Sequence, residues 1–453
     1  MIRLLHYADI ENVYDDPERA GRLAGLIGDL RDSDTLVCGA GDNTSPGVLT
    51  LKGDAFAALP FFRAVDPDVD TLGNHEFDRQ VSSLRDLLAE SPQTWVCANA
   101  RDGDGRFGAE EGVVPWTVLE ADGDRVGVFG VASPETDDIS PQAADLTFTD
   151  PVPAARDAVA ALRDRGVDHV VGLSHAGEDD PLARALDVPV ILGGHVHEHR
   201  TEYVDGTLLL RPGSGGHRLS EVTVDDDAAS ARWHAVADAD PDPAVVEEYR
   251  DRMAALGLDE TVAVLDGPVE RVAYRGESAV GNFVADAIRE AAGAGVGLMH
   301  GASIREDDPL RGEVTVADVV SLVPFDNDAL AVEVPGDRLR RALRDASAHH
   351  LGGHHRDRWY GQVSNARILW DHDAVELVEA RVGDEPLDPD RTYTVGMLDY
   401  VLRRGGLFRS LDPDLPHERV DGVHDVLVDH ARRAGIPTEA DGRIERVNLP
   451  TDA

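Results

Sequence analysis

Short apolar runs alternate with helical stretches from Met1 to about Leu219. The runs RLLHYA, TLVCGA, RVGVFGVAS, HVVGLSH and PVILGGH are typical of buried strands, and residues 17–30 and 154–165 show helical apolar spacing. Such alternation indicates a layered α/β domain and argues against an all-helical or all-strand chain. The later runs TLLLRPGS, LSEVTVD and ARWHAVA have no helices between them, so we expect them to close the domain as antiparallel strands.

The length of 453 residues predicts more than one domain, because single domains usually hold roughly 100 to 200 residues. A proline-led helical stretch, PDPAVVEEYRDRMAALGL, separates two regions with different patterns. We therefore expect a first domain over residues 1–240, a helical connector over 241–260 and a second domain over 261–453. The second domain mixes predicted helices with strands such as ALAVEVP and TYTVGM.

Acidic residues outnumber basic ones by 86 to 43, for a formal charge of −43. Nucleic-acid backbones are held by lysine and arginine, so this balance argues against a nucleic acid as the partner. The only lysine is Lys52, and the acidic residues are spread along the whole chain. Molar salt shortens the Debye length to about 3 Å and would suppress the repulsion between them, which favours a halophilic protein over an acidic mesophilic one.

Cys38 and Cys97 are the only cysteines, and both lie in apolar runs that indicate buried thiols rather than a disulfide framework. No apolar segment approaches the roughly 18 residues that a membrane span needs, so we expect no membrane association. The first strand begins almost at Met1, which leaves no room for a signal peptide. We therefore expect a cytoplasmic protein, whose oligomeric state stays open.

Metal-compatible side chains follow five of the predicted strands. Open α/β sheets place their sites at the carboxyl ends of strands, so these side chains are expected to converge. Glycines precede several of them and allow sharp turns. The candidates are Asp9, Glu11, Asp42, Asn74, His75, His175, His195 and His197.

The chemistry of these donors indicates two divalent cations. Carboxylates, an amide oxygen and imidazoles are present without any thiolate, a set that suits Mn²⁺, Zn²⁺, Co²⁺ or Mg²⁺. Two cations about 3.5 to 4 Å apart share a bridging ligand, and we expect Asp42 to be that bridge. Such a pair binds phosphoryl oxygens and lowers the pKa of bound water toward about 7, so that hydroxide is available at neutral pH.

The motifs GDN, GNHEFD and GGHVH, in that order after the DIE of Asp9 to Glu11, resemble those of the dinuclear metallophosphoesterases and, within them, the 5′-nucleotidases. The resemblance implies a four-layer αββα metallophosphoesterase domain followed by an α/β 5′-nucleotidase domain. It also implies that His75 and Asp78 form a catalytic dyad, in which the imidazole protonates the leaving oxygen and the carboxylate orients it. The implied ligands of one metal are Asp9, Glu11, Asp42 and His197, and those of the other are Asp42, Asn74, His175 and His195.

Glu11 departs from the family pattern, which has histidine at this position. A glutamate can still ligate through oxygen, and we expect it to favour Mn²⁺ or Mg²⁺ over Zn²⁺. The alternative is that Glu11 faces solvent and that the first metal is weakly bound or absent.

The second domain also resembles the family, in ESAVGNFVADAI, in VTVADVVSLVPFDND and in YGQVSNARILWD. HGASIR takes the place of the family's substrate loop NGGGIR, and GGLF resembles a shortened GGDGF. Two aromatic rings that clamp a base would supply stacking worth about 1 to 3 kcal/mol. The implied substrate-binding residues are Arg275, His300, Arg305, Tyr360 and Phe408.

These observations together predict a metal-dependent hydrolase that acts on a small nucleotide. We expect hydrolysis of nucleoside 5′-monophosphates to nucleoside and phosphate by a metal-activated hydroxide. One alternative is a phosphodiesterase for 2′,3′-cyclic nucleotides or nucleotide sugars. Another is a nucleotide-binding protein without catalysis, in which Glu11 and the altered HGASIR loop have removed activity.

Overall fold

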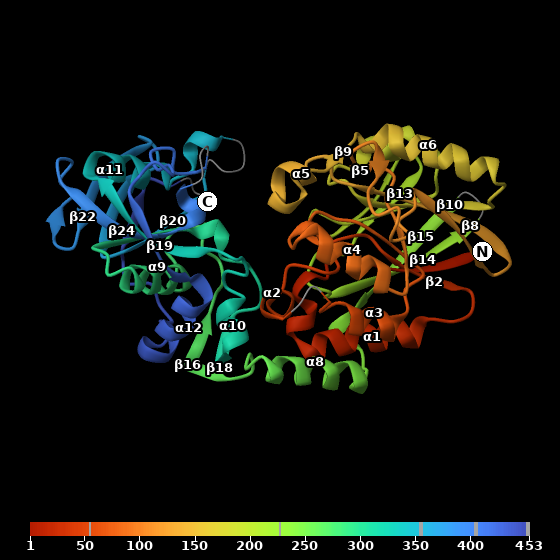
Figure 1. The fold of residues 1–453 in the computed structure, drawn as a ribbon, viewed down its shortest axis with the longest axis horizontal. Coiled ribbons are helices and arrows are strands. Elements are labelled where there is room, and N and C mark those ends of the chain that lie inside the picture. Colours follow the sequence, from red (N-terminus) through yellow and green to blue (C-terminus); the bar gives the residue numbers. More distant parts are fainter. Residues whose placement is uncertain (54–55, 226–227, 353–356, 403–405, 450–453) are drawn as a thin grey trace. The chain divides into compact units, whose positions relative to one another are not determined.

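The computed structural model describes residues 1–453 apart from 54–55, 226–227, 353–356, 403–405 and 450–453. The chain divides into two compact units, Met1–Leu256 and Gly257–Ala453. Figure 1 shows the first unit in red to yellow-green and the second in green to blue.

The first sheet of the first unit has the strand order β15-β14-β1-β2-β3-β4. Strands β1 to β4 run parallel, while β14 pairs antiparallel with β1 and β15 pairs antiparallel with β14. The bounds are β1 Ile2–Tyr7, β2 Thr35–Gly39, β3 Val69–Thr71, β4 Thr94–Val96, β14 Arg218–Asp225 and β15 Ala228–Ala235.

The second sheet has the order β12-β13-β11-β10-β8-β7. Its central strands run parallel, and the edge strands β7 and β12 are antiparallel to their neighbours. The sequence predicts TLLLR as an antiparallel closing strand. This prediction is wrong on the side of β11, because TLLLR forms β13, which runs parallel to β11. The bounds are β7 Trp116–Ala121, β8 Asp124–Ala132, β10 His169–His175, β11 Val190–Gly193, β12 Arg200–Val204 and β13 Thr207–Arg211.

The two sheets pack face to face around an apolar core and carry helices on their outer faces. Leu4 and Leu36 of the first sheet contribute to this core together with Val128 and Leu173 of the second. The outer face of the second sheet packs against α6 (Pro151–Asp164) and α7 (Asp180–Ala185). On the side of the first sheet lie α1 (Pro17–Leu30), α3 (Leu59–Val65) and α8 (Pro243–Ala255) (Figure 1). The predicted four-layer αββα architecture is therefore confirmed.

Helix α1 (Pro17–Leu30) illustrates how local sequence makes one of these layers. Asp16 caps the helix, since its carboxylate accepts the backbone N–H of Arg19 at 3.1 Å, and Pro17 occupies the first turn. The buried residues Ala20, Leu23, Ala24 and Ile27 recur at helical spacing. They form the face that packs toward the sheet.

Helix α8 (Pro243–Ala255), which the sequence predicts as a connector, is built into the first unit. It packs against α1 and α3 (Leu59–Val65). The Tyr249 hydroxyl donates to the Ala57 carbonyl oxygen at 2.9 Å and accepts the N–H of Phe61 at 3.1 Å. The division between the compact units falls after this helix, between Leu256 and Gly257.

The second unit is centred on a mixed sheet of order β20-β17-β24-β19-β25. Helix α9 packs on β17, β20 and β24, and a second sheet, β23-β22-β21-β26, adds a further layer with α11. The bounds are β16 Thr261–Val269, α9 Ala279–Ala291, β17 Val296–His300, β18 Leu310–Thr315, α10 Val316–Val320, β19 Asp328–Pro335, α11 Gly336–Asp345, β20 Gly361–Ser364, β21 Ala366–Asp371, β22 Glu376–Val382, β23 Glu385–Pro386, β24 Thr392–Leu398, β25 His417–Gly422, α12 Val423–Ala434 and β26 Ile444–Val447.

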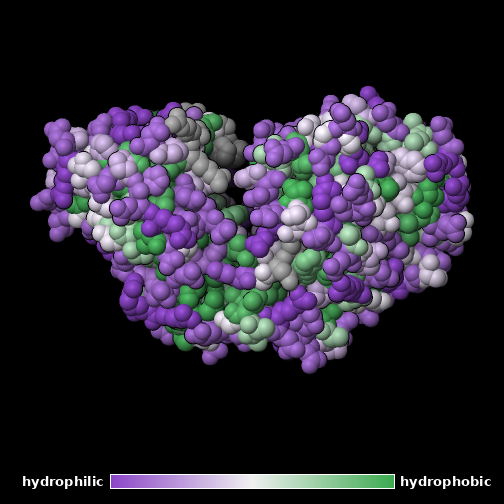
Figure 2. All heavy atoms as spheres, in the orientation of Figure 1, coloured by the Kyte–Doolittle hydropathy of each residue, from purple (hydrophilic) through white to green (hydrophobic). Residues whose placement is uncertain are grey.

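The surface is hydrophilic over most of the face that Figure 2 shows, on both units. Among the described residues, no helix combines the length and the apolar character that crossing a membrane requires.

The remaining elements of the first unit are α2 Val48–Lys52, α4 Val81–Glu90, α5 Thr136–Ile139, β5 Ala100–Asp102, β6 Gly105–Arg106 and β9 Thr147–Phe148.

Candidate functional site

The metal-compatible side chains follow the strands as the sequence predicts, and all of them belong to the first unit. Asp9 and Glu11 follow β1, and Asp42 follows β2. Asn74 and His75 follow β3, the next parallel strand. In the second sheet, His175 ends β10, while His195 and His197 follow β11.

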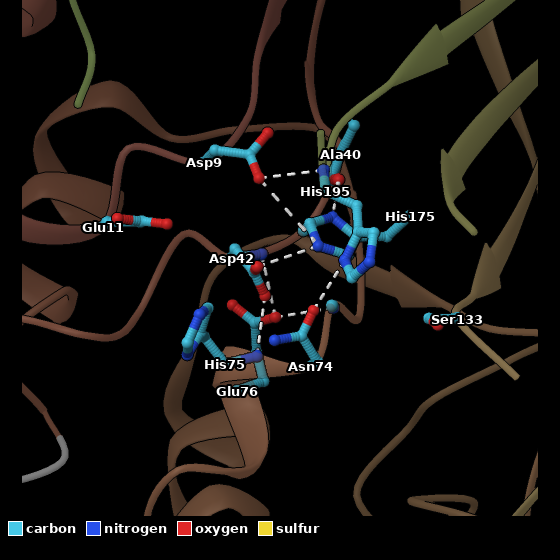
Figure 3. A network of polar contacts seen from close by, with 12 residues as sticks. Asp9, Glu11, Ala40, Asp42, Asn74, His75, Glu76, Ser133, His175 and His195 are labelled. Atoms are coloured by element: carbon cyan, nitrogen blue, oxygen red, sulfur yellow. Dashed lines mark hydrogen bonds and ion pairs between the residues drawn. The ribbon is translucent and has the colours of Figure 1, made fainter. Parts of the chain in front are cut away.

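One group of possible ligands consists of Asp42, His175 and His195, whose donor atoms lie within 4.8 Å of one another. His175 Nε2 lies 2.9 Å from Asp42 Oδ2, and His175 Nδ1 donates to the carbonyl oxygen of Ala40 at 2.8 Å (Figure 3). That second contact leaves Nε2 of His175 free to ligate. Asn74 joins the group, since its Oδ1 lies 2.8 Å from His195 Nδ1.

A second group consists of Asp9, Glu11 and His197, again with donor atoms within 4.8 Å. His197 Nε2 lies 2.9 Å from Glu11 Oε1 and 3.9 Å from Asp9 Oδ1. Asp9 and Glu11 are buried, while His197 is 41% exposed. The alternative of a solvent-facing Glu11 is therefore wrong, because this carboxylate is only 8% exposed and points among the other ligands (Figure 3).

Asp42 and Asp9 link the two groups. Asp42 also lies within 4.8 Å of Glu11 and His75 through donor atoms, which places it near both groups. Asp9 accepts the backbone N–H of His195 at 2.9 Å through Oδ1. This arrangement suits a bridging role for Asp42.

The backbone around these ligands is strained. Asp9, Glu11, Asp42 and His195 have φ values of 51°, 42°, 53° and 71°, in the left-handed region that side chains other than glycine rarely adopt. Such residues cluster at functional sites, where the surrounding structure holds them in place. Here the strained turns aim the carboxylates and the imidazole into one small volume.

Two glycines permit this crowding for different reasons. Gly41 has φ 85° and supplies the turn before Asp42. Gly73 is needed for close approach, because a Cβ at this position would overlap the carboxylate of Asp42. A side chain at position 73 would displace the Asp42 carboxylate, and one at position 41 would overlap the His175 ring.

The buried carboxylates of the site favour the binding of positive charge. Burial raises the pKa of Asp9 to about 7, assisted by the charges of Asp42 and Glu11 and opposed by that of His175. Asp9 Oδ2 is buried and has no hydrogen-bond partner among the described residues. Buried carboxylates this close together need cations or protons, so the donor set fits divalent metal ions.

His75 and Asp78 form the pair that the sequence predicts. His75 Nδ1 lies 2.7 Å from Asp78 Oδ2. Burial lowers the pKa of His75, but the charges of Asp78 and Asp42 and the hydrogen bond to Asp78 raise it to about 10. These contacts favour the protonated imidazole, which is the form that can act as an acid.

Glu76 is a positioning residue that the sequence analysis missed. This buried carboxylate accepts the backbone N–H groups of Asp42 at 3.0 Å, Asn43 at 2.8 Å and Gly73 at 2.6 Å. Asp70 has a similar role, since it accepts the N–H of Gly41 at 3.3 Å. The position of Glu76 inside GNHEFD is a signal that could have identified it.

The predicted substrate-binding residues belong to the second unit, and three of them form one ring cluster. His300 stacks on Tyr360 with ring centroids 5.3 Å apart, and its ring lies edge-on to Phe408 at 6.0 Å. Arg305 instead lies over the ring of Phe325 at 5.1 Å. Arg275 is exposed beside Tyr274, with its guanidinium 5.9 Å from that ring.

An αββα sandwich that gathers metal ligands at its strand ends defines the class of metallophosphoesterases. Residues 2–199 match the family model described as calcineurin-like phosphoesterase, and residues 260–412 match the 5′-nucleotidase C-terminal domain. The chain therefore combines a metallophosphoesterase domain with a 5′-nucleotidase C-terminal domain.

Relatives at low identity support this assignment. The chain is 24% identical to the trifunctional nucleotide phosphoesterase protein YfkN of Bacillus subtilis over 99% of its own length, but spans only 35% of that protein. It is 24% identical to an apyrase of Tabanus yao, with 93% of this chain and 87% of the relative covered. In structure it is similar to a 5′-nucleotidase precursor of Thermus thermophilus, with a TM-score of 0.79, 24% identity and coverage of 99% and 100%, a likeness that concerns the fold.

Proposed function

We propose that this chain hydrolyses phosphate monoesters, and specifically nucleoside 5′-monophosphates to nucleoside and phosphate. The observation that carries the proposal is the pair of ligand groups that meet at Asp42, beside the His75–Asp78 pair. The names of the relatives support a nucleotide as substrate, since they include a nucleotide phosphoesterase and 5′-nucleotidases.

Two divalent cations would be held by the two ligand groups. Asp9, Glu11 and His197 would hold one, His175, His195 and Asn74 the other, and Asp42 both. When bound, such cations polarise phosphoryl oxygens and lower the pKa of a coordinated water. The oxygen donor at Glu11 favours Mn²⁺ or Mg²⁺ at the first position.

His75 would supply the proton that the leaving oxygen needs. Its Nδ1 is engaged by Asp78, which leaves Nε2 to donate to the alkoxide that departs from phosphorus. Asp78 fixes the orientation of the ring and stabilises its positive charge. Glu76 holds the Asp42 loop through backbone N–H groups, which keeps the ligand geometry unchanged during the reaction.

A hydrolysis assay tests the proposal, with nucleoside and inorganic phosphate measured as the products of a monoester and nucleoside monophosphate measured as the product of a diester. Purified protein would be loaded with Mn²⁺, analysed for metal content and offered AMP, 2′,3′-cyclic AMP and a nucleotide sugar. We expect AMP to have the largest kcat/KM. Preference for either diester would favour the phosphodiesterase alternative, and metal binding without any turnover would favour a non-catalytic nucleotide-binding protein.

Replacing Glu11 with histidine is expected to shift the metal preference toward Zn²⁺. Imidazole suits later transition metals better than carboxylate does, so the ratio of Zn²⁺ to Mn²⁺ affinity should rise by about tenfold or more. Competitive metal titration with elemental analysis measures this ratio. Glu18→His, on α1 and outside the ligand groups, is the control. An unchanged ratio in Glu11→His would show that Glu11 is not a ligand.

We also propose that the protein is halophilic and cytoplasmic, on the basis of its formal charge of −43. Carboxylate repulsion across the surface weakens when salt screens it. The melting temperature should therefore be lower in 0.1 M KCl than in 3 M KCl, by roughly 10 °C or more. Calorimetry in KCl and in a non-ionic osmolyte separates screening from solvent exclusion. Equal melting temperatures at both salt concentrations would contradict halophily.

A further inference from the structure

In the second unit, the ring of His300 takes up a place within the ring cluster. His300 is the last residue of β17, and its ring lies nearly parallel to that of Tyr360, with an interplanar angle of 15° at 5.3 Å. The rings of Phe408 and Tyr400 stand at 88° and 85° to it, at 6.0 and 5.8 Å. A nearly parallel ring at this distance is the geometry in which aromatic groups stack.

The stacking surfaces of this cluster are closed. Tyr360 is 4% exposed and Phe408 2%, so neither offers a free face to a ligand. Tyr400, which the sequence analysis did not single out, is 40% exposed. Tyr400 is therefore the exposed ring of the cluster, while the His300 ring covers a face of Tyr360.

The backbone of His300 is held firmly. It pairs with Gly361 in the β17–β20 ladder, and the N–H of the next residue, Gly301, donates to the Tyr360 carbonyl oxygen at 2.5 Å. A Cβ on Gly301 would overlap the carbonyl oxygen of Ala273, so the strand end lies tightly against its neighbours. Movement of the ring therefore has to come from rotation of the His300 side chain.

The ring of His300, in contrast, has little to anchor it. Its Nδ1 is buried and has no hydrogen-bond partner among the described residues. Burial lowers the pKa of His300 to about 4, which favours the neutral ring at pH 7. Ring contacts with Tyr360, Phe408 and Tyr400 hold it in place, and a larger aromatic ligand can replace such contacts.

We propose that the ring of His300 occupies the stacking place on Tyr360 and must turn away before a nucleobase can bind there. The ring is thus an internal competitor that weakens base binding. This inference rests on the proposed function, because it concerns the base of the proposed nucleotide substrate.

The test measures binding of adenosine, which has a base and no phosphate, to the full-length chain by titration calorimetry. His300→Ala removes the ring and should tighten adenosine binding by about 5- to 100-fold relative to wild type. His300→Phe keeps a ring in the same place and is the matched control, with an affinity no higher than that of wild type. Thermal melts of both variants verify that they are folded.

Weaker or equal binding in His300→Ala would overturn the inference, because the residue would then contact the base or have no influence on it. Absence of adenosine binding in all three proteins would overturn it as well. Phosphate release from AMP is measured separately in each protein. Tighter adenosine binding without phosphate release would leave the inference standing and would contradict the proposed nucleotidase activity.

Discussion

Replacing Asp42 with asparagine is expected to abolish phosphate release and to reduce the content of bound divalent metal. Asp42 lies within reach of both ligand groups, so its charge serves both proposed cations. Asparagine keeps an oxygen that can accept the N–H of His75, now 2.7 Å from Asp42 Oδ1, and so preserves the local fold. Loss of several kcal/mol of charge stabilisation should lower kcat by more than about 10³-fold.

Metal analysis and kinetics with saturating Mn²⁺ measure this effect. Asp68→Asn is the control, because Asp68 precedes β3, at the end of the strand opposite to the ligands, and accepts the N–H of Val37. That variant should retain both metal and turnover. If Asp42→Asn kept full metal content and rate, Asp42 would not be a shared ligand.

Replacing His75 with asparagine is expected to lower kcat by about 10²- to 10⁴-fold while leaving the metal content intact. The imidazole is held 2.7 Å from Asp78 and donates a proton in the proposed mechanism. A leaving group that departs readily needs little protonation. The loss should therefore be much smaller for a phenyl phosphate with electron-withdrawing substituents than for AMP.

The difference between these two substrates is the measurement that isolates proton donation. His169→Asn serves as a control, since His169 pairs with Asp124 at 3.2 Å at the start of β10, away from the ligands. Equal losses of His75→Asn on both substrates would indicate damage to the site rather than loss of an acid. A full rate on AMP would show that His75 does not protonate the leaving group.

Much of the metal centre could be predicted because its ligands stand at the ends of apolar strand segments that can be recognised in the sequence. His175 ends a run of apolar residues, and the carboxyl ends of parallel strands meet at one edge of a sheet. The contribution of Glu76 could not be predicted in this way. Its contacts are with backbone N–H groups of a loop 33 and 34 residues away, and the GNHEFD motif marks the position of Glu76 without showing which groups it contacts.

In the second unit, the sequence predicts which rings come together but not how they are arranged. The sequence places His300, Tyr360 and Phe408 in motifs that resemble a substrate site, and these rings do come together. The sequence motifs do not record that the ring of His300 covers Tyr360. That depends on the register of β17 with β20, which sets His300 opposite Gly361.

The sequence by itself determined the α/β class, the order of the ligands along the chain and the acidic surface, because each follows from local residue types and their spacing. Only the tertiary structure decided that TLLLR runs parallel to β11, that α8 packs in the first unit and that Glu11 is buried beside His197. These features depend on contacts between segments far apart in the chain. Such contacts are selected by the packing of whole layers, and neighbouring residues in the sequence carry little information about them.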